Sequence, residues 1–188
     1  MNLKNFEFKA RVDDIDRYEN KLLYLNPEFQ GIDHQIDTYF STSIGRLKLR
    51  EGNIEHALIH YERGDTTGAK VSDIILYQHQ PDPGLKNILI RQLGIKVVVD
   101  KKRKIYFIDN VKFHFDTVDK LGTFIEVEAI DQDGSMSTAQ LLEQCNYYLQ
   151  YFNISQHQLI DKSYSDLPVS YTHLDVYKRQ YQYKRWQI

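Results

Sequence analysis

Several short segments of this chain alternate between apolar and charged residues, and this alternation constrains the fold more than any other feature. In residues 3–12 one parity is apolar (Phe6, Phe8, Ala10, Val12) and the other polar (Asn5, Glu7, Lys9, Arg11). Residues 46–51 repeat the pattern, with Leu47 and Leu49 between basic residues. Successive side chains of a strand point to opposite faces, so these segments predict strands with one apolar and one charged face.

The rest of the chain predicts further strands, joined by short turns and interrupted by helices. Strands are expected at residues 3–12, 34–41, 46–51, 57–63, 70–77, 95–107, 111–118 and 124–130. Helices are expected after an N-cap at Asp13, between Pro83 and Gly94, and after a capping box formed by Ser137 and Gln140. Short turns between consecutive strands favour antiparallel pairing, so the pattern predicts one mostly antiparallel β domain.

The composition excludes several functional classes. A net charge of −2 gives no general basic field, so we expect no nucleic-acid partner. No apolar stretch approaches ~18 residues, so no membrane span is expected. The start of the chain lacks the apolar core of a signal peptide, and the single Cys145 excludes an internal disulfide. A buried thiol fits a reducing compartment, which predicts a cytoplasmic protein.

The end of the chain departs from this organisation. Residues 168–180 show neither helical nor strand periodicity and resemble a translated adapter sequence. We therefore predict a single domain over residues 1–167 and a non-native tail at residues 168–188.

The charged parities separate into basic and acidic groups. Four of the basic residues are arginines, whose guanidinium groups can bind phosphate through two hydrogen bonds: Arg46, Arg50, Arg63 and Arg103. Glu126 and Glu128 share one strand face, and Asp116 lies on the hairpin partner, ~5 Å away. These carboxylates would repel one another unless a cation such as Mg²⁺ or Mn²⁺ lay between them. The simpler alternative is a solvated outer face of an open sheet.

Six motifs, taken in chain order, resemble CYTH domains, a superfamily that contains class IV adenylate cyclases, thiamine triphosphatases and inorganic triphosphatases. The motifs are Glu7-Phe-Lys9, Asp37-Thr-Tyr-Phe40, the basic run at 46–50, Lys101-Lys-Arg103, Glu126-Val-Glu128 and Lys162-Ser-Tyr-Ser-Asp166. Together with Asp116 they cover residues 3–167. The resemblance implies an α+β fold, namely an antiparallel β tunnel or barrel of about eight strands with flanking helices. The charged parity would then line the lumen.

The resemblance also assigns roles to individual residues. It implies a triphosphate-binding set of Lys9, Lys48, Arg50, Arg63, Lys101, Arg103 and Lys162, and a metal-binding set of Glu7, Asp116, Glu126 and Glu128 for Mg²⁺ or Mn²⁺. The catalytic set would be Glu7, Lys9, Glu126 and Glu128. By contrast, the residues themselves favour ordinary strand roles for His56, His60 and His114, although His114 shares the parity of Asp116.

The activity that the resemblance implies is that of the class IV adenylate cyclase-like branch, which converts ATP to cyclic AMP and pyrophosphate. An inorganic or thiamine triphosphatase is an alternative. The family signature Glu-x-Glu-x-Lys appears here as Asn5-Phe-Glu7-Phe-Lys9, so a non-catalytic nucleotide or polyphosphate binder is a third hypothesis. The partner would be ATP, tripolyphosphate or thiamine triphosphate, with a homodimer left open and neither nucleic acid nor membrane expected.

Overall fold

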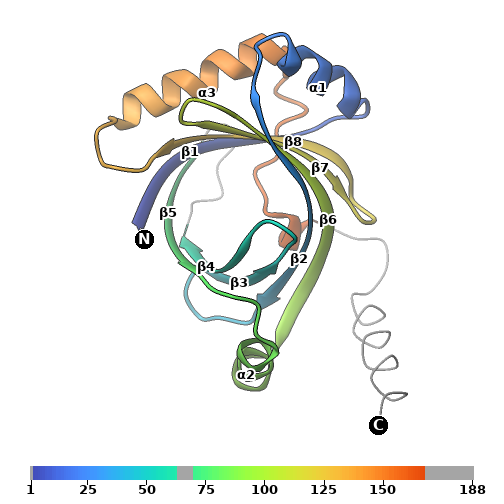
Figure 1. Cartoon of the computed structure of the whole chain (residues 1–188), viewed down its shortest axis with the longest axis vertical. Helices are drawn as coiled ribbons and strands as arrows, with labels where there is room; N and C mark the ends of the chain where they lie inside the picture. The colour runs from blue at the N-terminus through green and yellow to red at the C-terminus, as the bar shows by residue number, and fades with distance from the viewer. Residues whose placement is uncertain (1, 63–69, 168–188) are drawn as a thin grey trace.

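Figure 1 shows the computed structural model of the chain, which describes residues 2–62 and 70–167. Within these residues eight strands form one antiparallel sheet that closes into a barrel. They are β1 (Asn2–Arg11), β2 (Glu28–Phe40), β3 (Arg46–Glu51), β4 (His56–Glu62), β5 (Lys70–Gln78), β6 (Ile95–Ile108), β7 (Val111–Val118) and β8 (Gly122–Asp131). The predicted α+β tunnel fold is therefore confirmed.

The barrel closes because β1 pairs on both of its edges. Going around the ring the order is β1, β5, β4, β3, β2, β6, β7, β8, and β1 pairs with β5 on one side and β8 on the other. The strand predicted at residues 34–41 is longer than expected. The first half of β2 pairs with β6, and the register of this pairing shifts between Phe29 and Gly31. The second half, from Ile36 onward, pairs with both β6 and β3.

Three α-helices and one short 3₁₀ helix accompany the sheet in the described part of the chain: α1 (Ile15–Leu23), α2 (Pro83–Leu93), α3 (Thr138–Phe152) and η1 (Tyr164–Asp166). The expected N-cap of α1 was off by one residue, because Asp14 and not Asp13 accepts a hydrogen bond from the Arg17 amide. The capping box of Ser137 and Gln140 is present at α3. None of the described helices is long and apolar enough to cross a membrane.

The main core lies between the barrel and the helices α1 and α3, which cover β1, β7 and β8 (Figure 1). Phe6 and Phe8, from the apolar parity of β1, pack here with Phe113 of β7. From α3, Tyr148 contacts the ring of Phe113 edge-on, with the ring centroids 4.7 Å apart. The apolar side of the strands thus faces outward under the helices, which leaves the charged side for the interior.

The chain after α3 returns to the barrel and closes one of its ends (Figure 1). The amide of Ile160 bonds to the carbonyl of Lys9. Beyond it, the Ser163 hydroxyl lies 3.3 Å from the Tyr39 hydroxyl and 3.0 Å from the Tyr61 hydroxyl. The ring of Tyr164 packs on Phe124 among buried interior residues.

The packing of α3 on β1 predicts an unreactive thiol. Cys145 is fully buried, and its Sγ donates to the Phe6 carbonyl at 3.2 Å. Burial, with the charges of Glu7 and Glu128, raises the pKa of the thiol to about 12. We expect Ellman's reagent to leave the native protein unmodified and to label it fully in guanidinium chloride. Labelling that is faster than global unfolding would show that α3 does not keep the Cys145 thiol buried in the native protein.

Candidate functional site

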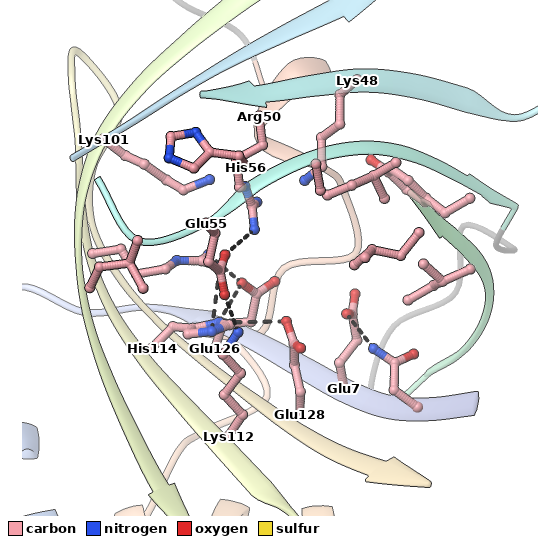
Figure 2. A pocket seen from close by; sticks show the side chains of 18 of the residues that line it. Glu7, Lys48, Arg50, Glu55, His56, Lys101, Lys112, His114, Glu126 and Glu128 are labelled. Atoms are coloured by element: carbon pink, nitrogen blue, oxygen red, sulfur yellow. Dashed lines mark hydrogen bonds and ion pairs between the residues drawn. The ribbon is translucent and has the colours of Figure 1, made fainter. Parts of the chain in front are cut away.

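A cavity of about 440 Å³ lies inside the barrel and is lined by the inward parity of its strands. Figure 2 shows charged side chains converging on it from several strands. Six lining residues are basic and four are acidic: Lys9, Lys48, Arg50, Lys101, Arg103 and Lys112, with Glu7, Glu55, Glu126 and Glu128. These charges are enclosed by the sheet, so the alternation of the strands describes a lumen and not a solvated outer face.

Asp37 of β2 is the common partner of three of these cations. Its carboxylate accepts from Arg50 at 2.9 and 3.0 Å, from Lys101 at 2.7 Å and from Lys48 at 3.4 Å. Burial alone would raise the pKa of Asp37, but the three cations hold it well below its usual range. Burial, reinforced by Arg50 and Arg103, lowers the pKa of the Lys101 ammonium to about 7, although Asp37 opposes that shift.

Arg103 of β6 is held by two acids on neighbouring strands. Its guanidinium binds both oxygens of Asp116 at 2.7 and 2.6 Å, and also Glu126 at 2.6 Å. Tyr164 donates to Asp116 at 2.8 Å, and Lys9 pairs with Glu126 at 2.7 Å. The orientation of the Arg103 guanidinium is therefore fixed by Asp116 and Glu126, and Tyr164 of η1 in turn holds Asp116.

A compact group formed by Glu126, Glu128 and His114 lies beside Arg103. Oxygens of Glu126 and Glu128 and a nitrogen of His114 lie within 4.8 Å of one another. Burial and the neighbouring Glu126 raise the pKa of Glu128 to about 7. Burial and the positive charge of Arg103 lower the pKa of His114 to about 3, so this imidazole is neutral.

The neutral His114 has a defined tautomer. Its Nε2 lies 3.5 Å from an Arg103 nitrogen, which can only donate, so Nε2 is the acceptor and Nδ1 carries the proton. Nδ1 lies 3.2 Å from Glu126 and 3.5 Å from Glu128. His114 therefore offers these carboxylates a hydrogen bond and offers a metal ion no free nitrogen in this arrangement.

Oxygen donors near Glu128 fit a hard divalent cation. Glu7 also lines the cavity, and the amide nitrogen of Asn5 lies 3.5 Å from its carboxylate. The Asn5 side-chain oxygen is buried and has no hydrogen-bond partner in the structure, although the residue lines the cavity. Carboxylate and amide oxygens are the ligands that Mg²⁺ and Mn²⁺ prefer. Asn5, Glu7 and Glu128 thus match the chemistry of such an ion.

Glu55, from the loop between β3 and β4, reaches across the lumen. One oxygen accepts from Arg50 at 2.7 Å and from Gln35 at 2.9 Å, and the other pairs with Lys112 of β7. Burial would raise the pKa of Glu55, but Arg50 and Lys112 hold it well below its usual range. The carboxylate is therefore charged and engaged on both oxygens.

The two ends of the cavity differ. At the η1 end the lining residues Tyr39, Ser163 and Tyr164 are buried. At the other end Gln78 and Gln80 are exposed, so this end is the mouth, together with His56 and His79. Ile59 and Leu76 of β4 and β5 give one wall an apolar surface. Charges therefore occupy one side of the lumen and apolar groups the other.

The structure brings most of the predicted site residues together. Those that line the cavity are Glu7, Lys9, Lys48, Arg50, Lys101, Arg103, Glu126 and Glu128. Asp116 lies behind the lining, fully buried, with both oxygens bound by Arg103 and one also by Tyr164. Lys162 is exposed and not part of the lining, whereas the adjacent Ser163 is. Arg63 lies outside the described residues.

Several residues of the site received no role from the sequence. Lys112 shares the parity of His114 and Asp116 on β7, so the period-two pattern contained that signal. Asp37 was part of a motif, but nothing local shows that three cations converge on it. Glu55 lies in a loop and Tyr164 in a 3₁₀ turn, where no periodicity indicates which side chain faces the lumen.

Comparison with known proteins agrees with this architecture. The CYTH domain model matches residues 3–163. "Putative adenylate cyclase MJ0240" of Methanocaldococcus jannaschii is 28% identical over 177 residues, covering 86% of this chain and 96% of that protein. The PH1012 protein of Pyrococcus horikoshii has a TM-score of 0.76 at 23% identity, covering 87% of this chain and 98% of that one. The Hippeastrum protein HpAC1, described as a putative adenylyl cyclase with a dominant triphosphatase activity, has a TM-score of 0.56 at 12% identity, with 96% of each chain covered.

The family model spans most of the chain, and the barrel and its charged lumen have the form that the resemblance implied. The chain belongs to the CYTH domain family.

Proposed function

We propose that this protein binds and processes a triphosphate, with a divalent metal ion, inside the barrel. The observation that carries the proposal is the cavity inside the barrel, because six basic side chains and a group of carboxylates line it together. Basic groups neutralise phosphate oxygens, and grouped carboxylates hold Mg²⁺ or Mn²⁺. Members of the CYTH family are adenylate cyclase-like or triphosphatase enzymes that act on such substrates.

The charge balance of the lumen supports a requirement for metal. Among the residues that the structure describes, every basic lining residue has a carboxylate partner, and Asp37 and Asp116 behind the lining bring the acids to six, equal to the bases. A triphosphate adds several negative charges to this balanced interior. Divalent ions held by Glu7, Glu126 and Glu128 would compensate them, with the Asn5 oxygen as a neutral further ligand.

The residues of the chain have separate tasks in the proposed reaction. Lys48, Lys101 and Arg103 bind and orient phosphate oxygens, and their carboxylate partners fix their positions before the ligand enters. The pKa of Glu128 is about 7 without metal, and a divalent cation held beside it would lower that pKa and keep the carboxylate ionised as a ligand. Mg²⁺ or Mn²⁺, held by Glu7, Glu126 and Glu128, would supply positive charge to stabilise the negative charge that develops on the phosphate oxygens.

We propose ATP as the substrate and cyclisation to cyclic AMP and pyrophosphate as the reaction, in which the 3′-hydroxyl attacks the α-phosphorus. The name of the Methanocaldococcus relative supports this choice. Attack by water on the terminal phosphorus would instead make the protein a triphosphatase, the activity named for the Hippeastrum neighbour. Asn5 supports a third function, binding without turnover, because its amide brings no charge to the metal site.

We also propose that the protein works in the cytoplasm. Cys145, the single cysteine of the chain, is a free buried thiol. Such a thiol is compatible with a reducing compartment. Fractionation of the source cells, with the protein followed in the soluble and membrane fractions, would test this location.

A product assay discriminates among the three functions. The protein, with residues 168–188 removed, is incubated with ATP or tripolyphosphate and with Mg²⁺ or Mn²⁺, and the products are separated by anion exchange. We expect cyclic AMP and pyrophosphate from ATP. ADP and orthophosphate from ATP, or pyrophosphate and orthophosphate from tripolyphosphate, would identify a triphosphatase. Saturable binding without product would identify a binder. Absence of binding to both compounds would overturn the proposal.

Lys48 offers a test of the anion site with little risk to the fold, because the one carboxylate paired with it in the described part of the chain is Asp37, at 3.4 Å. We expect Lys48→Met to weaken tripolyphosphate binding about tenfold, since one charge-assisted contact is lost. Lys102→Met is the matched control, because Lys102 lies on β6 and is exposed. Calorimetric titration measures both variants, and an equal loss in both would contradict a specific role for the lumen.

Lys101 predicts a pH dependence of binding. Its pKa of about 7 means that the free protein holds this group largely neutral above pH 7. A bound polyanion favours the ammonium form, so binding above pH 7 takes up a proton and weakens as the pH rises toward 9. Calorimetry of metal-free tripolyphosphate binding in two buffers with different ionisation enthalpies measures this uptake. Lys101→Met should reduce the proton uptake, and an uptake equal to that of wild type in this variant would assign it to another group such as Glu128.

A further inference from the structure

Glu55 connects parts of the barrel that do not pair with one another. In the ring, β3 and β7 are separated by β2 and β6, yet Glu55 binds Arg50 of β3 and Lys112 of β7 (Figure 2). Gln35 of β2 donates to the same carboxylate. One side chain from a loop therefore spans the lumen and engages two of its six cations.

The loop that carries Glu55 is held rigidly by a buried acid. Asp33, which is fully buried on β2, accepts hydrogen bonds from the backbone amides of Asn53, Ile54 and Glu55. Gly52 is needed for this approach, because a Cβ there would lie 2.5 Å from an oxygen of Asp33. The backbone at Glu55 is thus fixed, and the contacts with Arg50, Gln35 and Lys112 fix its side chain.

Glu55 lies toward the mouth of the lumen and not toward its closed end. On β7 its partner Lys112 lies four residues before Asp116, the residue that binds Tyr164 of η1. On β3 its partner Arg50 lies four residues after Arg46, which pairs with Asp166 of η1. Four residues of a strand span about 13 Å. The Glu55 bridge and η1 therefore bracket the part of the lumen that contains Lys48, Lys101 and Arg103.

We propose that Glu55 is a specificity-determining residue that limits the number of phosphates the lumen accepts. Its carboxylate neutralises Arg50 and Lys112, the cations that a longer phosphate chain would meet on the way to the mouth. A further phosphate there would lie beside the Glu55 carboxylate and would have to compete with it for Arg50 and Lys112. The inference rests on the proposed function, because it assumes that the phosphates of the ligand lie between this bridge and η1.

The surroundings of Glu55 indicate what the mouth accepts in place of a phosphate. Ile54, next to it in the loop, lines the cavity, as do Ile59 and Leu76 on the apolar wall. The side chains of His56 and Gln78 add hydrogen-bonding groups at the same end. A ligand group that extends past Glu55 would therefore meet apolar and hydrogen-bonding side chains.

The test compares the dissociation constants of tripolyphosphate and tetrapolyphosphate, measured by calorimetry with the full-length protein. In wild type we expect tetrapolyphosphate to bind no more tightly than tripolyphosphate. Glu55→Gln keeps the shape and removes the charge, so tetrapolyphosphate should gain about tenfold relative to tripolyphosphate. The control Glu51→Gln lies on the same hairpin but pairs with Lys86 of α2, and it should leave the ratio unchanged.

A double variant tests whether Lys112 makes the new contact with the longer phosphate chain. Because Lys112 would supply the new contact, Glu55→Gln combined with Lys112→Met should lose the gain. The proposal is overturned if Glu55→Gln, with the melting temperature of wild type, leaves the ratio unchanged, or if the gain persists in the double variant. Failure of the wild type to bind tripolyphosphate at all would instead overturn the proposed function.

Discussion

The burial of positive charge inside a closed barrel is the constraint on which the rest of this structure depends. Lys101 and Arg103 are each 2% exposed, and an unpaired ammonium or guanidinium at such a depth would cost several kcal/mol. Asp37 and Asp116 remove that cost by accepting short hydrogen bonds from behind the lining. Such pairs contribute little net stability, so the fold itself depends on the apolar layer between the barrel and α3.

This arrangement has a consequence for binding. Because the cations are already paired, they are oriented before a ligand arrives, and little reorganisation is needed to present them. For the same reason the lumen gives an anion little net attraction. A polyanion is then bound through the positions of the donors and through cations that it brings or meets, and not through a large positive potential. The weak overall charge of the chain, −2, is consistent with a site of this kind.

The period-two pattern predicted most of the strands and which side chains share a face, because that pattern reports burial directly. It could not predict which face is enclosed, since an open sheet and a barrel have the same alternation. Closure depends on β1 pairing with both β5 and β8, whose paired residues lie more than sixty and more than one hundred positions away along the chain. Glu55 and Tyr164 were missed because loops and 3₁₀ turns have no period. The role of Asp37 could not be predicted, because it depends on β2, β3 and β6 lying side by side in the barrel.

Asn5 changes the electrostatics of the acidic group as well as its capacity for metal. Glu126 and Glu7 already raise the pKa of Glu128, and a carboxylate at position 5 would add a further negative charge to the same side of the lumen. Without a cation, Glu128 would then be protonated over a wider pH range and a poorer proton acceptor. Asn5 offers an uncharged oxygen instead, so the carboxylate of Glu128 can ionise near neutral pH even without a cation. In the function proposed here, this departure from the family signature would lower the affinity for metal, because position 5 contributes no charge.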